Sequence, residues 1–295
     1  CRVQHSPRSE KHPRLPLLFT FSAVRFSNPF AMSESTRHYG QIALIILGYV
    51  LCSCVPADAA VSKYSEYIAP CPVNDQAFGQ CVKSAWQQIF NLMRTGVKEV
   101  GITKIDPMYV EKMTMNQGRD GDAMSLRLTL INATHTGMSY AKVTNVDVVP
   151  EKYKFNITFT IPHYEIDGQY DVNGKIVMIP VMGKGHGHAN LTDVKVTWRI
   201  QGEKAVDKVG NRFLKLTKFG MDLKPRRLHF QFDNLFNGNK ELGRMTNNVL
   251  NDQAEEIFKQ MKPLMEKQSN QLMFGVVKRF FDKNPYNDIF PGVKV

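Results

Sequence analysis

The sequence predicts an α+β fold in which a long bent helix lies against a long antiparallel sheet. Three observations carry this prediction. Apolar residues recur every three or four positions over 75–95, alternate with polar residues over 124–236, and return to a helical period over 240–282. Because each strand and each helix has one apolar face that must be covered, we expect the sheet to wrap around the last helix.

Residues 1–59 are interpreted as a leader and excluded from the fold. Residues 1–31 precede Met32, a plausible initiator, and show no sustained periodicity, so we expect untranslated message or a disordered leader there. Residues 32–59 have the three parts of a secretory signal peptide, which ends in small residues. Its apolar run of about eleven residues is too short for a bilayer core of about 30 Å, so a retained membrane anchor is the weaker interpretation.

The charge of the chain argues against one class of partner. The formal net charge of +11 falls to +8 when the six basic and three acidic residues of 1–59 are set aside. Lys and Arg are scattered along the chain instead of clustering with aromatic residues on one face, so we expect no nucleic-acid partner. Attraction to an anionic membrane surface stays open.

Only two cysteines, Cys71 and Cys81, follow the predicted leader. In a secreted chain, two cysteines ten positions apart most simply form a disulfide, which would tie the N-terminal arm to the first helix. A zinc site is the competing interpretation, but two thiols without a nearby Cys or His pair make a poor cage.

Three Asn-x-Thr sequons begin at Asn132, Asn156 and Asn190, and each is a candidate glycosylation site if the chain enters the secretory pathway. Asn156 lies in the alternating run 153–161, on the polar face of the predicted strand. A sugar there would point into solvent.

The alternating region predicts half-buried antiparallel strands at 126–130, 153–161, 194–200 and 228–232. Turn signals are expected to separate the strands. They stand at 167–168, 173–174, 183–187 and 210–211.

Two helices flank the strands in the sequence. The first covers 75–95, and Asp106-Pro107 would start a short further helical turn. The last, over 240–282, would be about 60 Å long if straight. Pro263 lacks an amide hydrogen, so we expect a bend near Lys259 rather than a stop.

Several segments resemble one protein family. The run LFNGNKELG at 235–243 and the run RFFDKNPY at 279–286 are similar to the takeout branch of the arthropod juvenile-hormone-binding family. The cysteine pair and the segments at 101–107, 164–168 and 179–185 follow in the order that this family shows. The resemblance covers nearly all of the chain after the leader.

The resemblance implies one domain over 60–295 with a tubular lipid-binding (TULIP-like) fold, like that of bactericidal permeability-increasing protein. A long helix would be rolled inside a strongly curved antiparallel sheet, and an apolar tunnel between them would hold a lipophilic ligand. Haemolymph hormone carriers of the family have a second disulfide in the sheet. This chain has no cysteine after Cys81, which favours a takeout-like member, and that branch is associated with feeding, circadian output and chemosensory tissues.

The predicted function is a secreted, extracellular carrier of a lipophilic small molecule such as juvenile hormone, another terpenoid or a fatty acyl lipid. Binding would be by partition into apolar surroundings, without a cofactor. Periodicity and the family architecture together nominate the tunnel-lining residues, although an apolar stripe is also what an ordinary core shows. The candidates are Trp86, Phe90, Met93, Phe155, Ile157, Phe159, Trp198, Phe230, Val249, Ile257, Met261 and Leu264.

Other polar residues have competing interpretations. Tyr153, Tyr164 and Tyr170 would either offer a hydroxyl to an ester, ketone or epoxide, or be ordinary strand residues. His186 and His188 have chelate spacing but lack further ligands, so no metal site is predicted. The adjoining glycine run lacks the spacing of a phosphate-binding loop.

No catalytic residues are nominated. The sequence contains no Gly-x-Ser-x-Gly elbow, no His-Glu-x-x-His motif and no cysteine nucleophile, so we do not expect an enzyme. The alternative functions are a membrane-active or lipopolysaccharide-binding secreted defence protein, and a receptor-directed signalling partner. We expect a monomer, with transient membrane or receptor contact left open.

Overall fold

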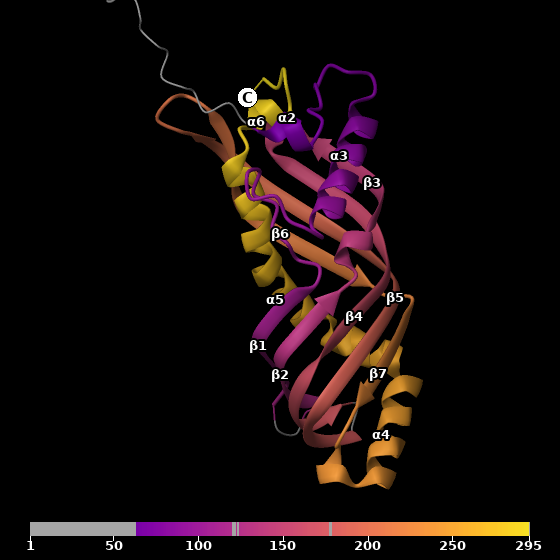
Figure 1. The fold of residues 1–295 in the computed structure, drawn as a ribbon. Helices are drawn as coiled ribbons and strands as arrows, with labels where there is room; N and C mark the ends of the chain where they lie inside the picture. Colours follow the sequence, from indigo (N-terminus) through magenta and orange to yellow (C-terminus); the bar gives the residue numbers. More distant parts are fainter. Residues whose placement is uncertain (1–62, 120–121, 123, 177–178, 295) are drawn as a thin grey trace, which may run out of the picture. The chain divides into compact units, whose positions relative to one another are not determined.

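A computed structural model describes residues 63–119, 122, 124–176 and 179–294 (Figure 1). These residues belong to one compact unit. The leader and signal peptide predicted over 1–59 lie outside the described residues.

The described strands form a single seven-stranded antiparallel sheet. The two longest strands, β4 and β5, pair along their whole length, from Lys154 opposite Gln201 to Ile176 opposite Ile179. The free edge of β4 carries β3 at one end and β2 at the other, and the free edge of β5 likewise carries β6 and β7. The strands are β1 Met108–Gln117, β2 Ser125–Thr136, β3 Lys142–Val149, β4 Lys154–Ile176, β5 Ile179–Val206, β6 Arg212–Lys224 and β7 Arg227–Phe232.

The four predicted strands are confirmed within β2, β4, β5 and β7. Three of the four predicted turns are wrong, because the glycines at 168, 174 and 183–187 lie inside the long strands β4 and β5. Because glycine has no side chain, these positions let neighbouring backbone segments come close together. A Cβ at Gly168 would come within 2.7 Å of the Cα of Ala133 on β2. The turn at 210–211 is confirmed between β5 and β6.

Helices precede and follow the strands in the chain, and short 3₁₀ turns lie between strands or directly after the last one. The helix predicted over 75–95 is confirmed as α3, which buries Trp86 and Phe90. The short helical turn predicted at Asp106-Pro107 is wrong, because the chain pairs with β2 from Met108 onward and so begins β1 there. The helices are α2 Tyr64–Tyr67, α3 Phe78–Leu92, α4 Lys240–Asp252, α5 Ala254–Lys283 and α6 Tyr286–Ile289, and the 3₁₀ turns are η1 Met138–Tyr140, η2 Pro150–Lys152 and η3 Phe236–Gly238.

The last long helix is interrupted ten residues earlier than its proline suggests. Gln253, with φ −110° and ψ 19°, separates α4 from α5, whereas α5 continues through Pro263. The two helices follow different strands, since α4 packs on β7 and α5 packs mainly on β6 (Figure 1). The break therefore lies where the supporting strand changes, and α5 continues through Pro263 without a stop, as the sequence predicted.

The sheet is strongly curved around α5. In the strand order β1-β2-β4-β5-β6, the strands β1 and β6 stand at opposite ends, yet α5 contacts both of them. A flat sheet would keep these two edges apart. The predicted α+β architecture, with the helix wrapped by the sheet, is confirmed.

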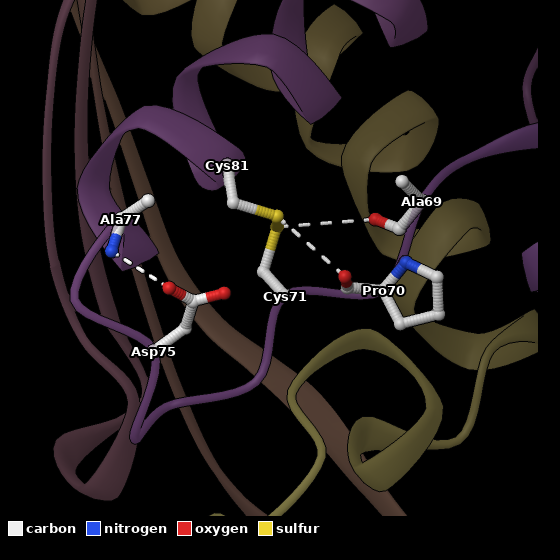
Figure 2. The surroundings of a disulfide bond; sticks show 6 residues. All are labelled: Ala69, Pro70, Cys71, Asp75, Ala77 and Cys81. Carbon is white, nitrogen blue, oxygen red and sulfur yellow. Dashed lines mark hydrogen bonds between the residues drawn. A yellow bond between two sulfur atoms is a disulfide. The ribbon is translucent and has the colours of Figure 1, made fainter.

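The disulfide between Cys71 and Cys81 is present, with Cα atoms 5.7 Å apart. Figure 2 shows it joining the segment before α3 to the first turn of that helix. Beside it, the Asp75 carboxylate accepts a hydrogen bond of 2.8 Å from the Ala77 amide at the helix start. The disulfide thus fixes the N-terminal arm against α3, as the sequence predicted.

Candidate functional site

An apolar cavity of about 190 Å³ lies between α5 and the part of the sheet that α3 does not cover. Eight of its 26 lining residues are methionines, and most of the others are Leu, Ile and Phe. Methionine is flexible and polarisable and adapts to varied partners. The cavity therefore suits an apolar molecule whose shape the wall can follow.

The strand side of the cavity follows from the two-residue period of β structure. Leu128 and Leu130 on β2 stand opposite Met115 and Met113 on β1, so all four side chains share one face of the sheet. That face turns inward because the sheet curves around α5. Each of these four side chains lines the cavity.

The helix side of the cavity follows from the helical period. Ile257, Met261 and Met265 are spaced four residues apart on α5 and line the cavity, as do Leu272 and Met273 farther along. This stripe runs past Pro263 on both sides, so packing holds the helix together across the proline.

The predicted tunnel residues fall into two regions. Phe230, Ile257 and Met261 line the cavity. Leu264 packs against the surrounding cluster without lining the cavity, and Val249 is half-buried on α4. The other seven candidates belong to a separate packed cluster beneath α3; they are Trp86, Phe90, Met93, Phe155, Ile157, Phe159 and Trp198.

The cluster beneath α3 is filled by its own aromatic rings. The ring centroid of Phe90 lies 4.5 Å from that of Phe159 and 5.3 Å from that of Trp198. Two voids that this cluster lines measure only about 10 Å³ each, room for about one water molecule. The fold therefore has a solid end and a hollow end.

The sequence patterns nominated neither the β1 side of the cavity nor the polar lining residues His135, Gln268 and Ser269. The alternation of Met113 and Met115 is short, and charged Glu111 and Lys112 precede it, so the local pattern does not predict β1 as a strand. His135 belongs to no recognisable sequence motif. Its place on β2, two residues from buried Ala133, was the available signal.

His135 and Tyr164 form a polar pair in the cavity wall. The Nδ1 atom of His135 lies 3.1 Å from the Tyr164 hydroxyl, while its Nε2 atom is buried and has no hydrogen-bond partner among the described residues. Burial lowers the pKa of His135 to about 4, so the ring is neutral at physiological pH. Burial also raises the pKa of Tyr164, which stays protonated.

The other two tyrosines considered from the sequence lie outside the cavity lining. The hydroxyl of Tyr170 donates to the Asp233 carbonyl at 2.5 Å, and burial raises the pKa of Tyr170 to about 12. Tyr153 packs its ring 4.7 Å from that of Tyr286. Of the three, Tyr164 is the one that can reach a molecule in the cavity.

The two histidines with chelate spacing share a carboxylate. Asp167 lies between them, 3.0 Å from His186 Nε2 and 3.3 Å from His188 Nδ1. Across the described ranges, no three His, Cys, Asp or Glu side chains are grouped so that they would hold a metal ion. The two histidines therefore share Asp167, an exposed hydrogen-bond acceptor, and this contact explains their spacing without a metal ion.

The helices within the described ranges are all too short or too polar to span a bilayer.

The chain is similar in sequence to a known protein family and to several of its relatives. Residues 46–291 match the family model for haemolymph juvenile hormone binding protein. The circadian clock-controlled protein daywake of Drosophila melanogaster is 23% identical over 225 residues, which cover 75% of this chain and 85% of daywake. A putative beta-carotene-binding protein of Schistocerca gregaria is 19% identical over 216 residues, covering 73% and 84% of the two chains.

A solved structure has the same fold. The crystal structure of Epiphyas postvittana Takeout 1 superposes with a TM-score of 0.67 at 24% identity, covering 76% of this chain and all of that one. The similarity supports the curved sheet with its long helix.

Proposed function

The chain belongs to the haemolymph juvenile hormone binding protein family, and we propose that it is a secreted carrier that holds a lipophilic small molecule in the cavity. The family consists of binding proteins, and the chain is not an enzyme. The proposal that the ligand is lipophilic and lies inside the protein rests on the cavity.

The observation that carries the proposal is the hollow, methionine-rich end of the fold. Moving apolar surface from water into such a site is favourable by about 25 cal/mol per Å², without any chemical step. Juvenile hormone, other terpenoids and fatty acyl lipids fit this chemistry. The name of the locust relative, which refers to beta-carotene, points to the same class.

Three features support secretion. Residues 32–59 have the pattern of a signal peptide, the chain has sequons at Asn132, Asn156 and Asn190, and the Cys71–Cys81 disulfide suits an oxidising compartment. We propose that the secreted protein is a glycosylated monomer. A soluble carrier needs no partner beyond its ligand.

The test is native mass spectrometry of the protein secreted from insect cells, followed by solvent extraction of any bound lipid. We expect a hydrophobic adduct at one molecule per chain. An empty protein that also takes up neither juvenile hormone nor a fatty acyl probe would contradict the proposal. In that case, binding to anionic vesicles that weakens with salt would favour the membrane-active alternative.

A matched pair of variants locates the ligand. Ala189 lines the cavity opposite Phe230 in the β5–β7 register, so Ala189→Phe would fill the space. Ala205→Phe places the same side chain near the far end of β5, where it pairs with β6 away from the cavity. We expect at least a tenfold loss of affinity in the first variant only; equal affinities would place the ligand elsewhere.

A further inference from the structure

The wall of the cavity contains a buried polar atom without a partner. His135 is 7% exposed and lines the cavity, and its Nε2 atom contacts neither solvent nor a hydrogen-bonding group of the described residues. Leaving such an atom unsatisfied is costly, and native proteins rarely do so without a functional reason. A molecule in the cavity would supply the missing partner.

The sheet holds the pair in place. His135 on β2 stands opposite Ile166 on β4, and Tyr164 lies two residues before Ile166 on the same face. The two rings are 6.0 Å apart between centroids, and the Tyr164 hydroxyl meets His135 Nδ1 at 3.1 Å. Because both residues belong to paired strands, the orientation of the imidazole is set before any ligand enters.

The contact with Tyr164 determines what Nε2 offers. A phenol O–H is a stronger donor than the N–H of a neutral imidazole, so the hydroxyl donates to Nδ1. The single proton of the neutral ring then sits on Nε2, which becomes a donor. The complementary ligand group is an oxygen that accepts a hydrogen bond and carries no proton of its own.

We propose that His135, oriented by Tyr164, is a specificity-determining residue that donates a hydrogen bond from Nε2 to the acceptor oxygen of a ketone, ester or epoxide ligand. This inference rests on the proposed carrier function. It divides the lipophilic class into oxygenated molecules, which the cavity prefers, and plain hydrocarbons, which it binds through apolar contacts alone.

The surroundings of His135 allow the ligand to reach it. Met108 stands opposite His135 in the β1–β2 register, and Met138 of η1 lines the same cavity. Both side chains have three rotatable bonds and can give way to a ligand oxygen. Neither offers Nε2 a strong acceptor of its own, so the ligand does not have to displace a hydrogen bond.

The experiment compares two probes that differ by one group. The ketone 2-undecanone and the alkane undecane have the same chain length, and competition between them is read by native mass spectrometry of the delipidated protein. One hydrogen bond gives the ketone a preference of about fivefold to tenfold. Equal binding of the two probes would overturn the inference while leaving the carrier function standing. Binding of neither probe would also overturn the inference, whereas the carrier function fails only if the protein takes up neither juvenile hormone nor a fatty acyl probe.

Variants assign the preference to the pair. We expect His135→Phe to abolish the preference and Tyr164→Phe, which frees the imidazole tautomer, to reduce it. His163→Phe, at the exposed neighbour of Tyr164 on β4, is the matched control and should keep it. A ketone preference that survives unchanged in His135→Phe would overturn the inference.

A spectroscopic measurement avoids dependence on the variants. The carbonyl stretch of ¹³C-labelled 2-undecanone bound to the unaltered protein should shift to lower wavenumber than in an alkane solvent, because the oxygen accepts a hydrogen bond. A stretch at the alkane-solvent position would show that the oxygen lacks a donor and would overturn the inference.

Discussion

The side chain of Asn251 on α4 pairs with the backbone of Phe230 on β7 in both directions. Its Oδ1 accepts from the Phe230 amide at 2.7 Å, and its Nδ2 donates to the Phe230 carbonyl at 2.8 Å. Asn247, one helical turn earlier, does the same with Phe232 at 3.0 and 2.9 Å. The two asparagines hydrogen-bond to β7 as a neighbouring strand would, and Phe230 and Phe232 of β7 line the cavity.

Replacing this amide should destabilise the fold. Asn251→Asp removes the donor and places a carboxylate against the Phe230 carbonyl, so we expect the free energy of unfolding to fall by about 2 kcal/mol. Urea denaturation followed by tryptophan fluorescence measures the change. Asn248→Asp, at an exposed position of the same helix, is the control. Equal stability of the two variants would mean that the amide contacts contribute nothing.

Removing the disulfide should lower stability without changing ligand affinity. The double variant Cys71→Ala, Cys81→Ala opens a loop closed across ten positions, which costs about 2 to 3 kcal/mol. Cys71 belongs to the filled cluster beneath α3, away from the cavity lining. Thermal unfolding and ketone binding are measured on the same samples. A large loss of affinity at a temperature where the variant stays folded would contradict the separation of the two regions.

Stability should fall as the pH drops from 6.5 towards 4. His135 has a pKa of about 4 in the fold against 6.5 when unfolded, so in this window the unfolded chain binds a proton that the folded chain excludes. The loss amounts to about 3 kcal/mol at the acid end and is absent above pH 7, where both states are neutral. Urea titrations of the unaltered protein and His135→Phe give the difference. Parallel pH profiles would show that His135 does not titrate in this way.

The three sequons should differ in occupancy. Asn132 and Asn156 are exposed, whereas Asn190 is half-buried where β5 pairs with both β4 and β7, and its Oδ1 contacts no solvent. We expect glycans on the first two sites only, because the half-buried side chain of Asn190 would have to move out of the sheet before a sugar could be attached to it. Peptide mass spectrometry after enzymatic deglycosylation in ¹⁸O water reports each site. A fully occupied Asn190 would contradict the expected order.

Local patterns in the sequence were sufficient for many elements of the fold. The two-residue period over 153–161 and the helical period over 75–95 identify β4 and α3, since each period reflects which side chains must be buried. The spacing of Cys71 and Cys81 identifies the disulfide. Glycines misled the turn prediction, because Gly168 marks a close approach to Ala133 and the same residue type also marks turns.

Other features depend on contacts between segments distant in the sequence. Pro263 is the visible helix breaker, but the chain breaks at Gln253, where α4 follows β7 and α5 follows β6. The pairing of His135 with Tyr164 joins residues 29 positions apart. Neither relationship has a local signature, because both arise from the register of strands and the curvature of the sheet.

The sequence by itself determined which side chains face inward, and only the tertiary structure decided where the interior is filled and where it is hollow. Phe159 and Leu128 both occupy alternating strand positions that predict burial. Phe159 meets Phe90 of α3 and packs solidly, whereas Leu128 faces a span of α5 whose side chains leave space. A periodic pattern gives the direction of a side chain. The volume left between facing side chains depends on which elements meet and how closely they approach.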